Sequence, residues 1–238
     1  MTFCLINRLN PINLINPIPN TMNKPGKALL LGATGLIGSH CLQALLDDDA
    51  FTEVEAWVRQ PMVNIHPKLR IVLVDFPDIF RMPDTDASYI FCCLGTTIKT
   101  AGSQEAFRKV DYEYVVEMAR FALRSGVQKF LVISSLGASA VASNFYLRTK
   151  GEMEEAVIRC GLPAVVILRP SMLLGKRNEF RPAEVIGKFV MQVFNFIFIG
   201  KMKKYRAIQA SDVAFAMVKL AKENNMGVIK IESDQIGK

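Results

Sequence analysis

Short apolar runs alternate along this chain with longer stretches whose apolar residues recur at helical spacing. Each apolar run is followed by polar or turn-forming residues, as expected of a buried strand. The runs are Lys27–Leu31, Val54–Val58, Ile71–Val74, Tyr89–Leu94, Lys129–Ile133 and Ala164–Leu168. Helices are expected over Leu36–Leu46, Gln104–Arg124 and Phe145–Cys160, and near Pro182–Phe198 and Asp212–Lys222. Apolar strands that alternate with amphipathic helices predict an α/β fold with a doubly wound parallel sheet covered on both faces.

The stretch KALLLGATGLIG (Lys27–Gly38) places three glycines at three-residue spacing between the first strand and the first helix. This order of strand, turn and helix is typical of the unit that binds a dinucleotide in a Rossmann fold. Gly32 is expected to make the tight turn, Gly35 to let the backbone approach the pyrophosphate, and Gly38 to let the helix pack close to the strand. The helix N-terminus then offers N–H groups and a partial positive charge to the phosphates. The alternative is a glycine-rich turn without a ligand, which the flanking strand and helix disfavour.

Ligands of such a sheet bind beyond the carboxyl ends of its strands. The polar or small residues that follow the predicted strands are therefore candidates for the site: Thr34, Arg59, Asp75, Gly95, Thr96, Ser134 and Ser135. An NAD site usually has a carboxylate at the end of the second strand, whereas Arg59 stands there in this chain and can bind a 2′-phosphate. We therefore expect NADPH or NADP rather than NAD, unless Arg59 is a solvated surface arginine. Asp75 fits an adenine contact and an ordinary strand terminator equally well.

Tyr146 and Lys150 lie four residues apart on one predicted helix, so both side chains project from the same face. An ammonium group beside a phenol in a desolvated crevice stabilises the phenolate. The tyrosine can then exchange a proton with a carbonyl or alcohol while hydride moves to or from nicotinamide. Ser135, with Ser134 as second choice, would hold the substrate oxygen, and Lys150 would also bind the nicotinamide ribose. A Tyr-x-x-x-Lys pair is common without any catalytic role, so this interpretation depends on the glycine turn and the serines.

Composition narrows the possible chemistry. The chain has 238 residues, half of them apolar, and a net charge of +7, which fits an anionic ligand but is too diffuse to indicate nucleic acid. His40 and His66 lie far apart, and the cysteines are odd in number and form no CxxC pair, so we expect neither a metal site nor a disulfide framework. The cysteines are Cys4, Cys41, Cys92, Cys93 and Cys160. Such cysteine usage suits a reducing compartment, and we expect a cytoplasmic protein in which Cys92 and Cys93 serve packing.

The chain is expected to contain one domain. Residues 1–25 repeat an Asn–Pro–Ile theme without an unbroken apolar core, which predicts a disordered lead rather than a signal peptide. Residues 26–238 would form a single NAD(P)-binding domain, of which 171–238 would contribute a cap on the substrate side. Phe189–Ile199 is about half as long as a bilayer-spanning helix. The basic run Lys201–Arg206 is more typical of a solvated turn, so membrane contact is not expected.

These motifs together resemble the short-chain dehydrogenase/reductase superfamily, and GATGLIG has the spacing of its extended and atypical branches. Three blocks, FCCLGTT (Phe91–Thr97), SNFYLRTKGEMEE (Ser143–Glu155) and LRPSMLLGKRNEFRPAE (Leu168–Glu184), are similar to the atypical group typified by the thirty-kilodalton Tat-interacting protein. The resemblance implies that Tyr146 relays the proton. It also implies a set of cofactor-binding residues: Thr34, Gly35, Leu36, Ile37, Arg59, Leu94, Gly95, Tyr146, Lys150, Leu173 and Arg181.

The sequence thus predicts an NADPH-binding oxidoreductase that reduces a small carbonyl compound with Tyr146 as the acid or base. One departure concerns Asp111, in KVDYEY, which stands where much of the superfamily has an asparagine that orders a water behind the lysine. The alternative is a regulatory module that senses NADPH and contacts a partner protein, although binding-only relatives often lose the Ser, Tyr or Lys present here. An epimerase or dehydratase acting on a nucleotide sugar would suit a longer segment after Glu184.

Overall fold

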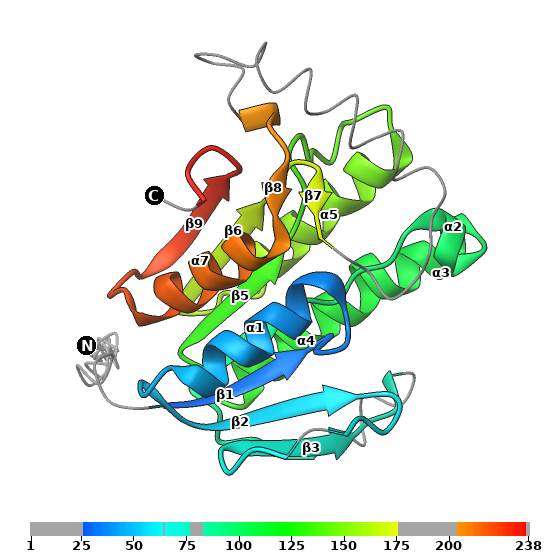
Figure 1. Cartoon of the computed structure of the whole chain (residues 1–238). Helices are drawn as coiled ribbons and strands as arrows, with labels where there is room; N and C mark the ends of the chain where they lie inside the picture. The colour runs from blue at the N-terminus through cyan, green and yellow to red at the C-terminus, as the bar shows by residue number, and fades with distance from the viewer. Residues whose placement is uncertain (1–25, 64, 77–82, 176–203, 237–238) are drawn as a thin grey trace, which may run out of the picture.

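Parallel strands form the sheet on which this protein is built, as Figure 1 shows. The computed structural model describes residues 26–63, 65–76, 83–175 and 204–236. Within these residues seven strands form one sheet in the order β3-β2-β1-β4-β5-β6-β9, and every neighbouring pair is parallel. Their bounds are β1 (Gly26–Leu31), β2 (Phe51–Val58), β3 (Leu69–Leu73), β4 (Tyr89–Cys92), β5 (Lys129–Ile133), β6 (Ala164–Arg169) and β9 (Gly227–Glu232).

Helices cover both faces of the sheet, as the sequence predicts for a doubly wound Rossmann fold (Figure 1). On one face α1 (Leu36–Asp47) packs against α7 (Ala210–Lys222), and α4 (Tyr114–Arg124) and α5 (Phe145–Arg159) cover the other. The shorter elements are α2 (Ile98–Ala101), α3 (Gln104–Arg108), the π-helical turn η2 (Lys109–Glu113), β7 (Leu173–Leu174) and β8 (Ile208–Gln209). Among the described residues, no helix is long and apolar enough to span a bilayer.

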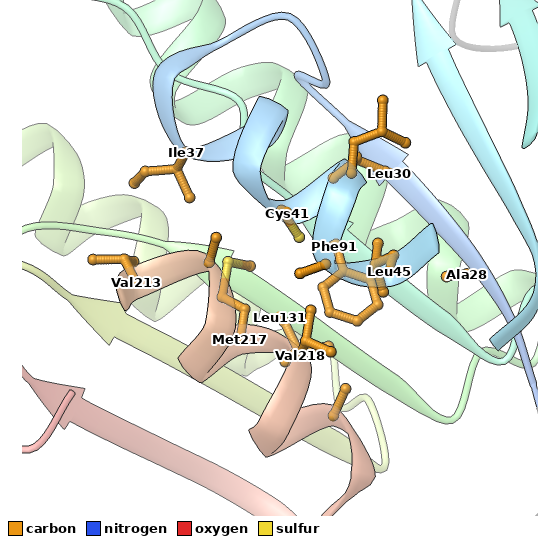
Figure 2. Close-up of a cluster of buried hydrophobic side chains, with 14 of the residues drawn as sticks. Ala28, Leu30, Ile37, Cys41, Leu45, Phe91, Leu131, Val213, Met217 and Val218 are labelled. Carbon is orange, nitrogen blue, oxygen red and sulfur yellow. The ribbon is translucent and has the colours of Figure 1, made fainter. Parts of the chain in front are cut away.

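Alternate side chains of strands β1 to β6 enter two separate hydrophobic cores, one on each face of the sheet. Figure 2 shows the core beneath α1 and α7, which includes Leu30 of β1, Phe91 of β4 and Met217 of α7. The next residue along β1, Leu31, lies in the other core with Trp57 of β2. Burial of a large apolar side chain contributes about 1.5 to 3 kcal/mol. Because the strands are buried on both faces, their sequences read as continuous apolar runs.

The structure differs from the sequence-based expectations in three segments. The helix expected over Gln104–Arg124 contains η2, which the apolar periodicity does not reveal. The sequence does not predict β9, because its alternating residues lie at an edge of the sheet. Residues 171–238 are expected to cap the substrate side, whereas α7 and β9, both from that segment, complete a face and an edge of the sheet. The helix expected near Pro182–Phe198, like the lead over residues 1–25, lies outside the described residues.

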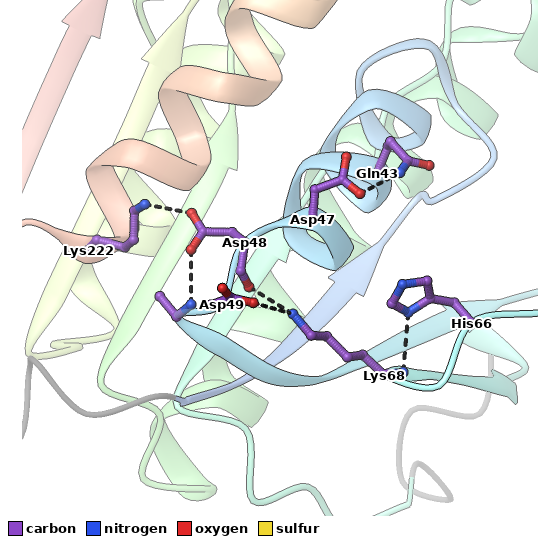
Figure 3. Close-up of polar contacts among 8 residues, drawn as sticks. Gln43, Asp47, Asp48, Asp49, His66, Lys68 and Lys222 are labelled. Carbon is purple, nitrogen blue, oxygen red and sulfur yellow. Dashed lines mark hydrogen bonds and ion pairs between the residues drawn. The ribbon is translucent and has the colours of Figure 1, made fainter.

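Charged residues join α1, β3 and α7 at the edge of the sheet where the strands begin (Figure 3). Asp48 follows the last residue of α1, pairs with Nζ of Lys222 at 2.5 Å and accepts a hydrogen bond from the N–H of Ala50 at 2.9 Å. Lys68 donates to the carbonyl oxygen of Asp48 at 3.2 Å and to the carboxylate of Asp49 at 3.5 Å. Exposed ion pairs contribute at most about 1 kcal/mol each. These contacts therefore fix the path of the chain more than they stabilise the fold.

Lys129, the first residue of β5, is buried and caps the C-terminus of α7. Its ammonium group donates to the carbonyl oxygens of Leu220, Ala221 and Glu223, which have no partner within the helix. A cation at this position also complements the helix dipole. This explains why an otherwise apolar strand begins with lysine.

Candidate active site

The strand order creates a crevice between β1 and β4. The chain runs from β1 outward to β2 and β3, then returns to the other side of β1 as β4. At such a reversal, ligands bind beyond the carboxyl ends of the two central strands. A cavity of about 430 Å³ opens there. The predicted site residues that line it are Thr34, Gly35, Leu36, Ile37, Leu94, Gly95, Thr96, Ser134, Ser135, Tyr146, Lys150 and Leu173.

The glycine turn after β1 has the shape of a phosphate cradle. Gly32 has a φ of +78°, and a Cβ on it would lie 2.6 Å from the carbonyl oxygen of Cys93. A Cβ on Gly38 would lie 1.9 Å from the carbonyl oxygen of Gly32, so α1 packs against the turn at a distance that only glycine permits. Gly35 precedes α1 without a side-chain cap, and Leu36, the first helical residue, lines the cavity. The N–H groups of this first turn have no acceptor within the helix, so the cradle fits a pyrophosphate.

Lys150 and Asp111 form a buried ion pair in the lining of the cavity. Nζ of Lys150 lies 2.8 Å from Oδ1 of Asp111, and the two side chains are 4% and 1% exposed. Nζ also donates to the carbonyl oxygen of Ile133 at 3.3 Å. Burial acts to lower the pKa of Lys150, but the negative charge of Asp111 is the main influence that outweighs it and raises the pKa above the ordinary 10.5. Lys150 is therefore an ammonium group at neutral pH.

Asp111 reaches the cavity from η2, between α3 and α4. A π turn inserts an extra residue into a helix, and such turns are frequent at functional sites. The second carboxylate oxygen of Asp111 accepts a hydrogen bond from the backbone N–H of Thr96 at 2.8 Å. One carboxylate thus joins the loop after β4 to Lys150 of α5.

Tyr146 lies one helical turn before Lys150, near the start of α5. Asn144 caps this helix, because its side chain accepts a hydrogen bond from the N–H of Leu147 at 3.1 Å. The ring of Tyr146 is half-buried and lies 5.5 Å, centroid to centroid, from the ring of Phe107 of α3. The cap and the ring contact together fix where the phenol enters the cavity.

The two serines after β5 have different partners. Ser134 is buried, and its hydroxyl donates to Oε1 of Glu154 at 2.6 Å. Arg169 holds the same carboxylate with Nε and Nη2. Ser135 is half-buried, and its hydroxyl donates over a long 3.4 Å to the carbonyl oxygen of Leu136. Ser134 is therefore committed to the network around Glu154, whereas the hydroxyl of Ser135 is the better placed to bind a substrate oxygen.

Four described residues that were predicted to bind the cofactor do not line the cavity, namely Gly32, Gly38, Arg59 and Asp75. Gly32 and Gly38 shape the turn and its packing instead. Arg59 is exposed and follows β2, the strand beside β1, on the side toward which the adenosine of a dinucleotide would extend. Asp75 is exposed and follows β3, one strand further out. Arg181 lies outside the described residues.

The cavity also has lining residues that the sequence does not predict as site residues, namely Ser39, Cys93, Thr97, Thr100, Ile133, Pro170 and Ser171. Cys93 and Thr97 belong to the block FCCLGTT, so the family resemblance could have identified these two as lining residues. A hydrogen bond to Cys41, together with burial, raises the pKa of Cys93 well above its ordinary value. Burial raises the pKa of Cys92 to about 12. Neither sulfur is a thiolate at neutral pH, which agrees with the packing role expected for this pair.

A larger hollow, of about 970 Å³, lies beside α7 and away from the glycine turn. It is lined by residues such as Arg206, Phe215 and Ile231. Because it contains none of the predicted site residues, the smaller cavity at the strand ends is the candidate active site.

Comparison with known proteins agrees with this geometry. Residues 32–224 match a protein family described as NAD(P)H-binding. The chain belongs to this family. Among its relatives, the mitochondrial protein FMP52 of Debaryomyces hansenii is 32% identical over 201 residues, which are 82% of this chain and 88% of that protein. The mitochondrial protein fmp52 of Aspergillus clavatus is 35% identical over 213 residues, which are 86% and 88% of the two chains.

Solved structures of other proteins share the fold. UDP-N-acetylglucosamine 4-epimerase from Methanobrevibacter ruminantium M1 has a TM-score of 0.66 at 19% identity, and the match covers 88% of this chain and 77% of the other. MoeE5 in complex with UDP-glucose and NAD has a TM-score of 0.64 at 19% identity, with 87% and 76% covered. At these identities the likeness concerns the fold alone. The chain therefore has an NAD(P)-binding domain with a Rossmann fold.

The relatives correct two sequence-based expectations. The expectation of a cytoplasmic protein is wrong, because the FMP52 relatives are named as mitochondrial proteins. Cysteine usage argues only against an oxidising compartment and does not distinguish the cytosol from other reducing ones. The relatives are FMP52 proteins rather than members of the Tat-interacting group, and the family match confirms the broader expectation of an NAD(P)-binding protein.

Proposed function

We propose that this protein is an NADPH-dependent oxidoreductase that reduces a small carbonyl compound by hydride transfer. The observation that carries the proposal is that Tyr146, Lys150 and Ser135 line the same cavity as the glycine turn. A proton donor, a buried ammonium group and a weakly bonded hydroxyl beside a dinucleotide cradle are the groups that carbonyl reduction uses.

Tyr146 acts as the acid in this reaction. Reduced nicotinamide, when bound, supplies hydride to the carbonyl carbon. The phenol of Tyr146 gives its proton to the carbonyl oxygen, so the product is an alcohol and the phenolate regains a proton from solvent. Lys150 stabilises the phenolate through its positive charge, and Ser135 donates a hydrogen bond that orients the substrate oxygen.

Arg59 supports NADPH as the preferred cofactor. It follows β2, where an NAD-binding chain usually has a carboxylate that accepts from the ribose 2′-hydroxyl. A guanidinium at this place would repay its desolvation by pairing with a 2′-phosphate.

A mitochondrial location is the second part of the proposal. It is supported by FMP52 relatives that match more than four-fifths of this chain. Fractionation of cells that express the tagged full chain tests it, and recovery outside mitochondria would contradict it.

The enzyme proposal is tested by two measurements on the purified protein. Fluorescence titration with NADPH measures binding, and the loss of NADPH absorbance against a panel of aldehydes, ketones and quinones measures reduction. Tyr146→Phe is expected to abolish reduction and to retain NADPH binding. Tyr205→Phe, a change at an exposed tyrosine outside the cavity, is the matched control and should behave as wild type.

Each outcome selects one function. Reduction that survives Tyr146→Phe would remove this residue from the mechanism. Tight NADPH binding without reduction across the panel would favour a regulatory dinucleotide sensor over an enzyme. Activity toward a UDP-sugar instead would favour an epimerase, the activity named for one of the structural neighbours.

A further inference from the structure

We propose that Asp111 is a positioning residue that keeps Lys150 in its ammonium form and ties it to the loop after β4. The inference rests on the function proposed above, which gives Lys150 its use: an ammonium group that binds the nicotinamide ribose and stabilises the phenolate of Tyr146. The contacts of one buried carboxylate lead to it.

Both oxygens of Asp111 face hydrogen-bond donors. Oδ1 lies 2.8 Å from Nζ of Lys150, and Oδ2 accepts from the backbone N–H of Thr96 at 2.8 Å. An asparagine side chain has one acceptor oxygen and one NH₂ group. It would satisfy one of these donors and turn its own NH₂ toward the other. The site is therefore matched to a carboxylate and not to the amide that much of the superfamily carries at this position.

Asp111 also supplies the charge that balances Lys150. The groups that face Lys150 are the carbonyl oxygen of Ile133 on β5, the phenol of Tyr146 on α5, the thiol of Cys92 on β4 and the carboxylate of Asp111 on η2. The thiol is uncharged at neutral pH, because burial raises the pKa of Cys92 to about 12. Among the described residues that line the cavity, Asp111 is the single carboxylate. Without it, burial alone would favour the neutral amine.

Asp111→Asn tests the charge without any ligand. Lys150 would keep its burial and lose its counter-charge, so the pKa of Lys150 is expected to fall below 10.5. Over the alkaline range the folded variant would then bind fewer protons than its unfolded chain, and its stability would rise with pH. In wild type the pKa of Lys150 is raised, so no such rise occurs below about pH 10. We therefore expect the gap in melting temperature between the two proteins to narrow from about pH 7 to about pH 10.

Glu152→Gln is the matched control. Glu152 lies on α5, the helix of Lys150, and pairs with Arg108 outside the cavity lining. The difference in melting temperature between Glu152→Gln and wild type should stay constant over this pH range. A constant gap for Asp111→Asn as well would indicate a purely structural role and overturn the inference. If Asp111→Asn does not fold, the double variant with Lys150→Met should, because it buries no unpaired ammonium group. A double variant that remains unfolded would overturn the inference too.

NADPH titration over the same pH range provides the second measurement. The dissociation constant of wild type is expected to stay level, whereas that of Asp111→Asn should rise roughly tenfold as Lys150 loses its charge. Parallel curves for the two proteins would overturn the inference. Neither measurement uses a carbonyl substrate, so a failure of the substrate panel would reject the proposed reduction and leave this result standing.

Discussion

Gly38 and Gly32 lie so close together that a Cβ on Gly38 would be 1.9 Å from the carbonyl oxygen of Gly32. Because that oxygen belongs to the backbone, no side-chain rotation relieves the contact. Gly38→Ala is therefore expected to push α1 away from the turn, to lower the free energy of unfolding by about 1 to 3 kcal/mol and to abolish NADPH binding. Chemical denaturation and fluorescence titration measure the two effects.

Gly35→Ala is the control for this prediction. Gly35 has a φ of −79°, which any residue adopts, and a Cβ on it would lie 3.2 Å from the nearest atom. This variant should lose less than about 1 kcal/mol of stability while still weakening NADPH binding, because its methyl group stands where the pyrophosphate approaches. Equal stability losses in Gly35→Ala and Gly38→Ala would contradict the packing described.

Ser134 and Ser135 allow a comparison of neighbouring hydroxyls. Ser135→Ala is expected to lower kcat on the carbonyl substrate roughly a hundredfold, because the substrate oxygen loses a donor, and to leave the melting temperature unchanged. Ser134→Ala leaves the buried carboxylate of Glu154 without one of its donors, so it should cost about 1 to 3 kcal/mol of stability and keep most of kcat. The reverse pattern would exchange the roles of the two residues.

Arg59→Ala is expected to weaken NADPH binding roughly tenfold and to leave NADH binding unchanged, because the lost contact is to the 2′-phosphate. Arg159→Ala, which removes an exposed arginine of α5 paired with Glu155, controls for the loss of net charge. Titrations of both variants with both cofactors provide the measurement. If NADH and NADPH affinities fall together in Arg59→Ala, the arginine does not read the 2′-phosphate.

The free energy of unfolding at acid pH should depend on Glu154. Burial opposes ionisation of this carboxyl group, but Arg169, Ser134 and Lys230 outweigh it and hold the pKa of Glu154 below its ordinary 4.5. A lowered pKa contributes stability that is complete above about pH 4.5 and is lost as the pH falls through the folded-state value. Glu154→Gln should therefore be about 3 to 5 kcal/mol less stable than wild type at neutral pH, with the gap shrinking at lower pH.

Urea denaturation of Glu154→Gln between about pH 3 and about pH 7 checks this prediction. Glu155→Gln changes the next residue, which is exposed and paired with Arg159, and it should cost less than about 1 kcal/mol at any pH. A gap for Glu154→Gln that does not change with pH would show that its charge is not what the network uses.

The elements with local signals could be predicted from the sequence. The glycine turn depends on close packing and on a backbone conformation that favour glycine, so the three glycines identify it. The strands of the sheet centre are recognisable because both of their faces are apolar. β9 is not recognisable in this way, since among the described residues it has a neighbouring strand on one side only and its side chains are more exposed.

The site itself required contacts between residues distant in sequence. Asp111 and Lys150 lie 39 positions apart, and their pairing depends on a π turn that has the same apolar pattern as an α-helix. Ser134 and Ser135 differ in role because the hydroxyl of Ser134 donates to Glu154, which lies on α5 and is distant in sequence. The location of a protein in the cell depends on recognition by cellular machinery rather than on folding. Cysteine usage was therefore a poor basis for expecting a cytoplasmic protein.

The number of residues in the π-helical turn decides which side chains of α3 lie beside Tyr146. An α-helix turns about 100° per residue, so the loss of one residue from η2 would rotate α3 by about that angle relative to α4. Phe107 would then leave the ring of Tyr146, and a different side chain would form that wall. Related chains can thus keep every motif letter of the glycine turn and the Tyr-x-x-x-Lys pair and still accept different molecules, according to whether a single residue was gained or lost in this helix.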